Sequence, residues 1–158
     1  MSAEDVSFMQ RAFELARKGM NSNAGGPFGC VIVKDGRVIG EGWNRVTSDN
    51  DPTAHAEVVA IRDACKNLSS FQLTGCKVYT SCEPCPMCLG ALYWARPDAI
   101  FFAGTREDAA FGGFDDDFIY KELDRPREER TIPLTSLLAS EGRELFVEWL
   151  NKSDKTRY

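Results

Sequence analysis

Two short stretches of the chain carry side chains that together could bind a metal ion. The first, DPTAHAEVVAIRDAC from residue 51, contains His55, the only histidine of the 158 residues, and Glu57 two positions later. The second, TSCEPCPMC from residue 80, holds three of the six cysteines at intervals of three residues. An imidazole followed by clustered thiols is a donor set from which proteins build zinc sites.

His55, Cys85 and Cys88 would supply three ligands, the number in a catalytic zinc site that leaves its fourth position to water. Cys85 and Cys88 are three residues apart at an expected helix start, so their side chains face the same way. The partial positive charge of a helix N-terminus favours the thiolate, the form that binds metal. A zinc ion held in this way lowers the pKa of water to about 7. Glu57 is then placed to carry protons as general base and acid.

A structural zinc site is the alternative that the same residues allow. Cys82 lies three residues before Cys85 and could close the tetrahedron as a fourth ligand. We favour the open site because Cys82 is expected at the end of a strand before Pro84, and because a closed site gives Glu57 no task. The other three cysteines lie on apolar runs and are expected in the core: Cys30, Cys65 and Cys76.

Hydrophobic periodicity predicts the elements that position these residues. Apolar residues three and four apart predict a helix over 5–20, and Asp35-Gly36 between two β-branched runs predicts a hairpin over 30–43. Further segments are expected as strands over 76–81 and 99–104, a strand or extended arm over 131–138, and a C-terminal helix over 141–152. The alternation of helices and strands indicates an α/β fold with helices packed on a sheet.

Prolines are expected to place both motif stretches at helix starts. Asp51 can cap a helix with Pro52 as its first residue, and this helix would run to about Leu68. Glu83-Pro84 would begin the second helix, which Pro97 would end.

Composition restricts the class of protein. With 19 basic and 24 acidic residues, the net charge is −5 and the sequence pI is near 5.0, which argues against binding a phosphate backbone. No apolar run approaches the roughly 20 residues of a membrane span, and MSAEDVSFMQ is no signal peptide. We therefore expect a cytoplasmic protein with reduced cysteines and without nucleic-acid or membrane partners.

The chain resembles the cytidine deaminase superfamily and, within it, the bacterial-type guanine deaminases. His55-x-Glu57 followed by Pro84-Cys85-x-x-Cys88 matches the signature of zinc-dependent nucleobase deaminases. The flanking stretches GGPFG at 25–29 and GFDDDFIYKEL at 113–123 carry the closer resemblance. The resemblance implies zinc-dependent hydrolysis of guanine to xanthine and ammonia, in purine catabolism. It also implies an α/β/α three-layer sandwich with a central mixed five-stranded sheet.

The same resemblance implies one deaminase domain over 1–158 and a homodimer. Residues 140–158 would form a C-terminal helix and tail that cover an active site, either that of the same subunit or that of the partner subunit. Carried over by position, the metal ligands would be His55, Cys85 and Cys88, and Glu57 would shuttle protons. The expected substrate-binding residues are Asn44 for a hydrogen bond to the purine, Phe28 against its ring, the N–H of Ala56 at its carbonyl oxygen, and Asp116 and Tyr158 at its far side.

Acids near the pocket have a physical rationale. Guanine presents N1–H and its 2-amino group as donors, and a buried donor without a partner costs about 1–3 kcal/mol. A carboxylate such as Asp116, in the FDDD run, would satisfy these donors and could also help ammonia leave.

Other functions remain open at this point. Deamination of adenosine in transfer RNA uses the same zinc signature but needs basic residues for phosphates. A free nucleoside, guanosine or cytidine, or free cytosine would need a different pocket wall. A non-catalytic, zinc-stabilised interaction domain would have the closed site with Cys82 and no use for Glu57.

Overall fold

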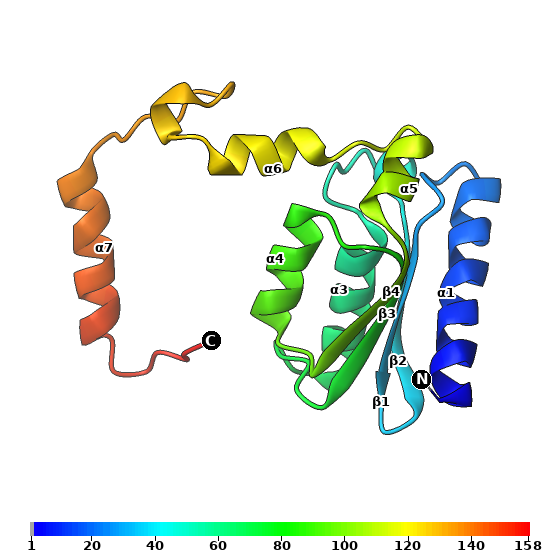
Figure 1. Cartoon of the computed structure of the whole chain (residues 1–158). Coiled ribbons are helices and arrows are strands. Elements are labelled where there is room, and N and C mark those ends of the chain that lie inside the picture. Colours follow the sequence, from blue (N-terminus) through cyan, green and yellow to red (C-terminus); the bar gives the residue numbers. More distant parts are fainter. Residues whose placement is uncertain (1) are drawn as a thin grey trace. The chain divides into compact units, whose positions relative to one another are not determined.

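A mixed β-sheet is the framework of the first of two compact units, Met1–Asp117 and Phe118–Tyr158. The computed structural model describes residues 2–158. The first unit contains α1 (Ala3–Asn21), β1 (Gly29–Lys34), β2 (Arg37–Trp43), α2 (Val46–Asp49), α3 (Ala56–Leu68), β3 (Cys76–Cys82), α4 (Pro86–Ala95), β4 (Ala99–Gly104) and α5 (Arg106–Phe111) (Figure 1).

The sheet has one strand fewer than expected. β1 pairs antiparallel with β2 and with β3, whereas β3 and β4 are parallel. Within residues 2–158 there is no fifth strand, because residues 131–138 form an irregular segment. Pro133 in that segment has no N–H to donate to a strand ladder. The α/β fold and the mixed sheet are as predicted, and the five-stranded count is corrected to four.

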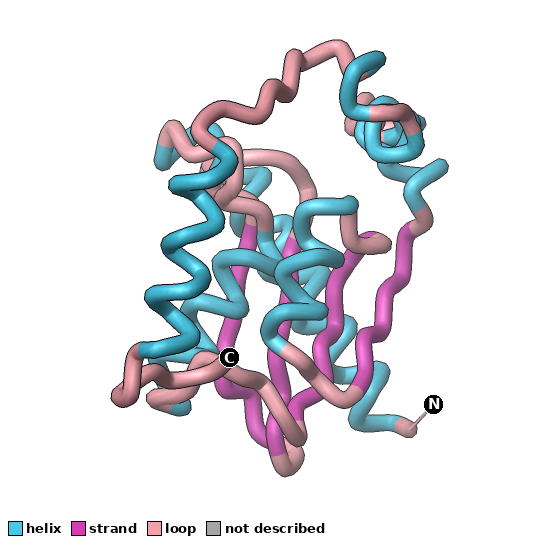
Figure 2. The backbone as a smooth tube through the Cα atoms, turned by 90° about the vertical axis from the view of Figure 1, so that its left-hand side faces the viewer, coloured by secondary structure: helices cyan, strands magenta, loops and turns pink. Residues whose placement is uncertain are grey.

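Helices cover both faces of the sheet. In Figure 1, α1 lies on one side of the strands and α3 and α4 on the other. Figure 2, viewed from the α4 side, shows the strands running side by side behind these helices. Successive side chains of β1 point to opposite faces of the sheet and so contribute to two cores. Cys30 and Ile32 pack with α3 and α4, and Val31 and Val33 pack with α1.

The predicted hairpin is confirmed between β1 and β2. Asp35 and Gly36 both have positive φ, at 50° and 71°, as a two-residue type I′ turn requires. The amphipathic N-terminal helix is also confirmed and begins with a capping box in which Ser2 and Asp5 bond each other's backbone N–H groups.

Both motif helices begin later than their prolines suggested. Asp51 accepts the Thr53 N–H at 2.8 Å and its hydroxyl at 2.7 Å, so it caps a turn, and α3 begins only at Ala56. The second helix, α4, begins at Pro86 because β3 continues to Cys82 and the Glu83 N–H then donates to the Gly104 carbonyl at 2.8 Å.

α3 lies unusually close to strand β2. A Cβ on Gly42 would overlap the Ala56 carbonyl oxygen and lie 2.6 Å from the Ala60 nitrogen. A Cβ on Gly40 would lie 2.6 Å from the Ala64 Cβ. The two strand glycines therefore face alanines that are spaced four residues apart on the helix. These small residues set the distance between α3 and the sheet.

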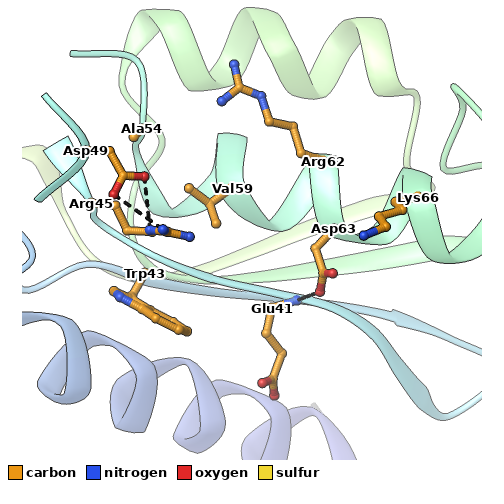
Figure 3. Close-up of a pocket in the computed structure, with 9 residues that line it drawn as sticks. All are labelled: Glu41, Trp43, Arg45, Asp49, Ala54, Val59, Arg62, Asp63 and Lys66. Carbon is orange, nitrogen blue, oxygen red and sulfur yellow. Dashed lines mark hydrogen bonds and ion pairs between the residues drawn. The ribbon is translucent and has the colours of Figure 1, made fainter. Parts of the chain in front are cut away.

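The close approach also lets α3 cover the edge of the sheet. The Asp63 carboxylate accepts the Glu41 N–H of the edge strand at 3.0 Å, as Figure 3 shows, and Asn67 donates to the Ile39 carbonyl at 3.0 Å. A cavity of about 440 Å³ lies beside these contacts. Its lining mixes acids and bases around a Trp and small apolar residues: Glu41, Trp43, Arg45, Asp49, Ala54, Val59, Arg62, Asp63 and Lys66 (Figure 3). The hydrogen bonds from Asp63 and Asn67 to backbone groups of β2 protect this edge of the sheet from pairing with another strand.

The second unit contains the end of α6 (Asp117–Asp124), the 3₁₀ turn η1 (Arg127–Glu129) and α7 (Ala139–Asn151). The predicted C-terminal helix is confirmed as α7. Its large apolar side chains are mostly exposed, with Phe146 at 72% and Leu150 at 66%. An amphipathic helix with an uncovered apolar face needs a further surface to pack on. Among residues 2–158, no helix has the length and apolar character to cross a membrane.

Substituting Gly42 with Ala should push α3 away from β2. We expect a loss of about 1–3 kcal/mol in the free energy of unfolding, because the overlap falls on backbone atoms that cannot move aside. Urea denaturation measures this change. Gly142→Ala in α7 is the control, since its Cβ would meet nothing within 4 Å and the change should stabilise by about 0.4–1 kcal/mol. Equal effects of the two changes would contradict the packing argument.

Candidate active site

The motif residues meet where two helices begin. His55 is the N-cap residue of α3, with φ −68° and ψ 155°, and Cys85 is the N-cap residue of α4, with φ −64° and ψ 167°. Pro86 occupies the first position of α4, where its missing N–H is not needed. Cys88 follows in the first turn of α4 and is fully buried. Both helices thus present their N-terminal, partially positive ends to one point.

The donor atoms at that point have the spacing of a zinc site. His55 Nδ1 lies 3.5 Å from the Sγ atoms of Cys85 and of Cys88. Ordinary zinc bond lengths in a tetrahedral arrangement separate such a nitrogen and sulfur by about 3.6 Å. All three donor atoms lie within 4.8 Å of one another. These three residues therefore fit a zinc ion with one coordination position left over.

Cys82 is turned away from this group. Its Sγ lies 3.6 Å from the carbonyl oxygen of Thr105, and it is not among the residues that could share a metal. Burial raises the pKa of its thiol to about 11, which disfavours the thiolate that a metal would need. The arrangement favours the open site over the closed one.

The two ligand thiols differ electrostatically. The hydrogen bond from the Cys88 thiol and, after it, the interaction with His55 lower the pKa of Cys85 to about 4. The pKa of Cys88 is raised by its bond to Cys85 and by burial. One thiolate is already favoured at neutral pH, and metal binding would displace the remaining proton.

Glu57 is the buried carboxylate of the site. It is the second residue of α3 and is 6% exposed. Its Oε1 accepts the Thr80 hydroxyl at 3.0 Å. Burial raises the pKa of Glu57 above the ordinary value, while hydrogen bonds to its carboxylate act in the opposite direction. A carboxylate whose pKa is shifted toward neutrality suits proton transfer in both directions.

Asn44 is also buried, at 6% exposure, immediately after β2. Its backbone N–H donates to the Phe28 carbonyl, and its Oδ1 accepts the Val46 N–H at 3.1 Å. This bond identifies the amide orientation and leaves Nδ2 as a donor for a ligand. A Cβ on Gly25 would overlap Oδ1, so the GGPFG stretch leaves room for this side chain.

The remaining predicted residues of the first unit lie as follows. Phe28 packs against the α3–α4 core and meets Phe114 edge-on, with ring centroids 4.9 Å apart. Ala56 is the first residue of α3, so its N–H has no acceptor within the helix. The pKa of Asp116 is raised, first by burial and then by the charge of Cys85. The assignment of Asp116 to the substrate pocket stays a prediction.

Tyr158, the last predicted contact, lies in the second unit and is 72% exposed. Its assignment to the substrate pocket stays a prediction.

Two residues of the site were not identified from the sequence. Thr80 is a polar side chain in a buried strand, and the alternation of Cys76, Val78 and Thr80 along CKVYTSC was a usable signal that it faces α3. Phe114 stands beside Phe28 across Gly26, whose Cβ would lie 2.8 Å from the Phe114 ring. Its sequence neighbours gave no periodic pattern from which this contact could be inferred.

Comparison with known proteins agrees with this geometry. A family model for the cytidine and deoxycytidylate deaminase zinc-binding region matches residues 2–104. The guanine deaminase of Bacillus subtilis is 59% identical over 152 residues, covering 96% of this chain and 97% of that protein. Its X-ray structure covers 100% of this chain and 99% of that one at 58% identity, with a TM-score of 0.95. A tRNA-specific adenosine deaminase of Aquifex aeolicus is 36% identical over 126 residues, 80% of this chain and 81% of that protein.

Zinc content distinguishes the open from the closed site. Cys85→Ala should lose most of the bound zinc, because two protein ligands hold the ion poorly. Cys82→Ala should retain about one zinc per chain, since its thiol faces the Thr105 carbonyl. Elemental analysis of the dialysed proteins measures both. Loss of zinc from Cys82→Ala to the same extent would restore the structural site.

Proposed function

The chain belongs to the cytidine and deoxycytidylate deaminase family, and we propose that it hydrolyses guanine to xanthine and ammonia with zinc as its cofactor. The observation that carries this substrate is the similarity to guanine deaminase over nearly the whole of both chains. Family membership alone gives the reaction class, because the zinc region is common to enzymes acting on different bases.

His55, Cys85 and Cys88 would hold the zinc ion, which when bound activates water for hydrolysis at neutral pH. His55 would use Nδ1 as the ligand atom, which leaves the ring proton on Nε2. The helix N-termini of α3 and α4 favour the thiolates that metal binding requires. The ligand set thus comes from two rigid elements held in place by the sheet.

Glu57 would manage the protons of the reaction. Its carboxylate takes a proton from the attacking water and returns protons to the ring nitrogen and to the departing amine at C2. The balance is guanine plus water giving xanthine plus ammonia, with no other reactant. Deep burial keeps bulk water from exchanging with this proton and raises the pKa of the carboxyl group.

Substrate recognition would come from donors on one side and an acid on the other. Asn44 Nδ2 and the Ala56 N–H can donate to acceptors of the purine, and Phe28 can pack against its ring. Asp116 can accept from N1–H and the 2-amino group, and can assist the departure of ammonia.

Deamination of adenosine in transfer RNA is the competing activity, since tRNA-specific enzymes are also similar to this chain. The net charge of −5 disfavours it. The similarity to those enzymes is lower and covers less of the chain than the similarity to guanine deaminase. We therefore retain the free base as the substrate.

Dimerisation is part of the proposal. α4 is apolar on all sides, and Tyr93 and Trp94 on its outer face are 75% and 67% exposed. A helix of that composition is typical of a protein interior, so a second copy would cover it. The uncovered apolar face of α7 supports a C-terminal segment, 140–158, that packs on a subunit and brings Tyr158 to a substrate pocket.

A cytoplasmic location is also part of the proposal. The six cysteines form no disulfide bonds with one another, as is usual in a reducing compartment.

A spectrophotometric screen of guanine, guanosine, cytosine, cytidine and adenine tests the proposed substrate. We expect turnover of guanine alone. Glu57→Gln should lower kcat by about 10²–10⁴-fold, since the amide cannot accept or return a proton. Zinc content should be unchanged, and Glu14→Gln on the exposed face of α1 serves as control. Turnover of a nucleoside instead would show that the pocket is open at the ribose end.

Asp116→Asn should reduce kcat for guanine by about 10²-fold, because a neutral amide cannot stabilise the positive charge that develops on the departing amine as a carboxylate can. Asp115→Asn is the matched control, because the Asp115 carboxylate accepts the Asp117 N–H in its own loop. Zinc content measured in parallel should stay constant, and near-normal turnover of Asp116→Asn would remove this residue from the mechanism.

Deletion of Tyr158 tests whether the tail closes a substrate pocket. We expect KM for guanine to rise when this residue is removed.

A further inference from the structure

Thr80 is a buried hydroxyl on the sheet beneath the proposed proton shuttle. It lies on the same face of β3 as Cys76 and Val78, which belong to the core under α3 and α4. Its neighbour Tyr79 faces the opposite core, under α1. Alternation along one strand thus directs Thr80 toward the start of α3.

The contact between Thr80 and Glu57 is short and sheltered from water. Thr80 Oγ1 donates to Glu57 Oε1 at 3.0 Å, and the two residues are 1% and 6% exposed. A neutral hydroxyl that donates to a carboxylate makes a charge-assisted hydrogen bond, roughly twice as strong as a neutral one. Since Oε1 is held by this bond, Oε2 is the oxygen left for the reaction.

We propose that Thr80 is a positioning residue for deamination, which fixes the Glu57 carboxylate in the orientation for proton transfer. This inference rests on the proposed role of Glu57. Thr80 acts through Glu57 and does not itself touch the substrate.

The strand makes Thr80 suitable for this task. β3 is a central strand, and Thr80 pairs with Cys30 of β1 on one side and with Phe102 of β4 on the other. Its side chain is β-branched and has few accessible rotamers. The donor therefore has a fixed place relative to α3, which a longer, more flexible side chain would not have.

Three variants test the proposal. Thr80→Val removes the hydroxyl with little change of shape, and Thr80→Ser retains it. Tyr79→Phe is the matched control, because Tyr79 is the neighbouring buried residue of β3 and its hydroxyl also donates to a carboxylate, that of Asp5, at 2.7 Å. For each protein, kcat and KM for guanine, zinc content and melting temperature are measured.

Thr80→Val should lower kcat by about 10–100-fold, the usual effect of removing a partner that orients a metal-site group. Its KM should stay within about twofold and its zinc content should not change. Thr80→Ser should recover most of the lost kcat. Tyr79→Phe should lower the melting temperature but keep the kcat of the wild type.

Other results would overturn the inference. If Thr80→Val keeps the wild-type kcat in an active enzyme, the hydrogen bond is only structural, while the proposed function stands. The same holds if Thr80→Ser is as slow as Thr80→Val, or if the loss of kcat follows a loss of zinc or equals that of Tyr79→Phe. A wild-type protein with bound zinc and no turnover of guanine would overturn the proposed function and this inference with it.

Discussion

The contact between α3 and strand β2 determines where the metal ligands can lie. Gly40 and Gly42 bring the backbone of α3 so close that a methyl group on Gly42 would overlap the Ala56 carbonyl. His55 is the residue before Ala56, so its imidazole is placed by this contact. The Asp63 and Asn67 side chains then reach the exposed edge of β2 and hold the helix against sliding. A ligand group in which the His55 nitrogen lies 3.5 Å from each sulfur needs such rigidity, because each donor atom has little freedom before coordination is lost.

A second constraint is the burial of a carboxylate that must remain able to ionise. Removing a charge from water is costly unless hydrogen bonds replace the lost solvation. Glu57 receives such a bond from Thr80, and it lies in the first turn of α3, where the helix dipole favours negative charge. Burial and hydrogen bonding act in opposite directions on its pKa, and the balance leaves it above the ordinary value. The site therefore combines a fixed carboxylate with a pKa that is raised toward neutrality.

The two units contribute different kinds of surface. The first supplies the ligand group, the buried Glu57 and the Asn44 and Phe28 side chains from one sheet and its helices. The second carries mostly exposed apolar residues on α7 and has little core of its own. Such an arrangement is typical of a segment whose stability comes from a surface outside itself. This is the physical reason for proposing that the C-terminal segment packs on a subunit of a homodimer.

The sequence by itself determined the elements and the identity of the chemical groups. Periodicity fixed α1, the hairpin turn at Asp35-Gly36 is local chemistry, and the spacing of Cys85 and Cys88 requires only one helical turn. It misplaced the helix starts, because whether Asp51 caps a turn or a helix depends on competing hydrogen bonds that a sequence does not rank. It also allowed Cys82 as a ligand, since spacing cannot show where a thiol at a strand end points.

Only the tertiary structure decided these matters. The direction of Cys82 toward Thr105, the meeting of Phe28 with Phe114, and the donation from Thr80 to Glu57 all join residues that lie more than 20 positions apart. Such contacts depend on strand pairing and on the height of α3 above the sheet. Both are set by packing of the whole unit, which no local pattern of residues encodes.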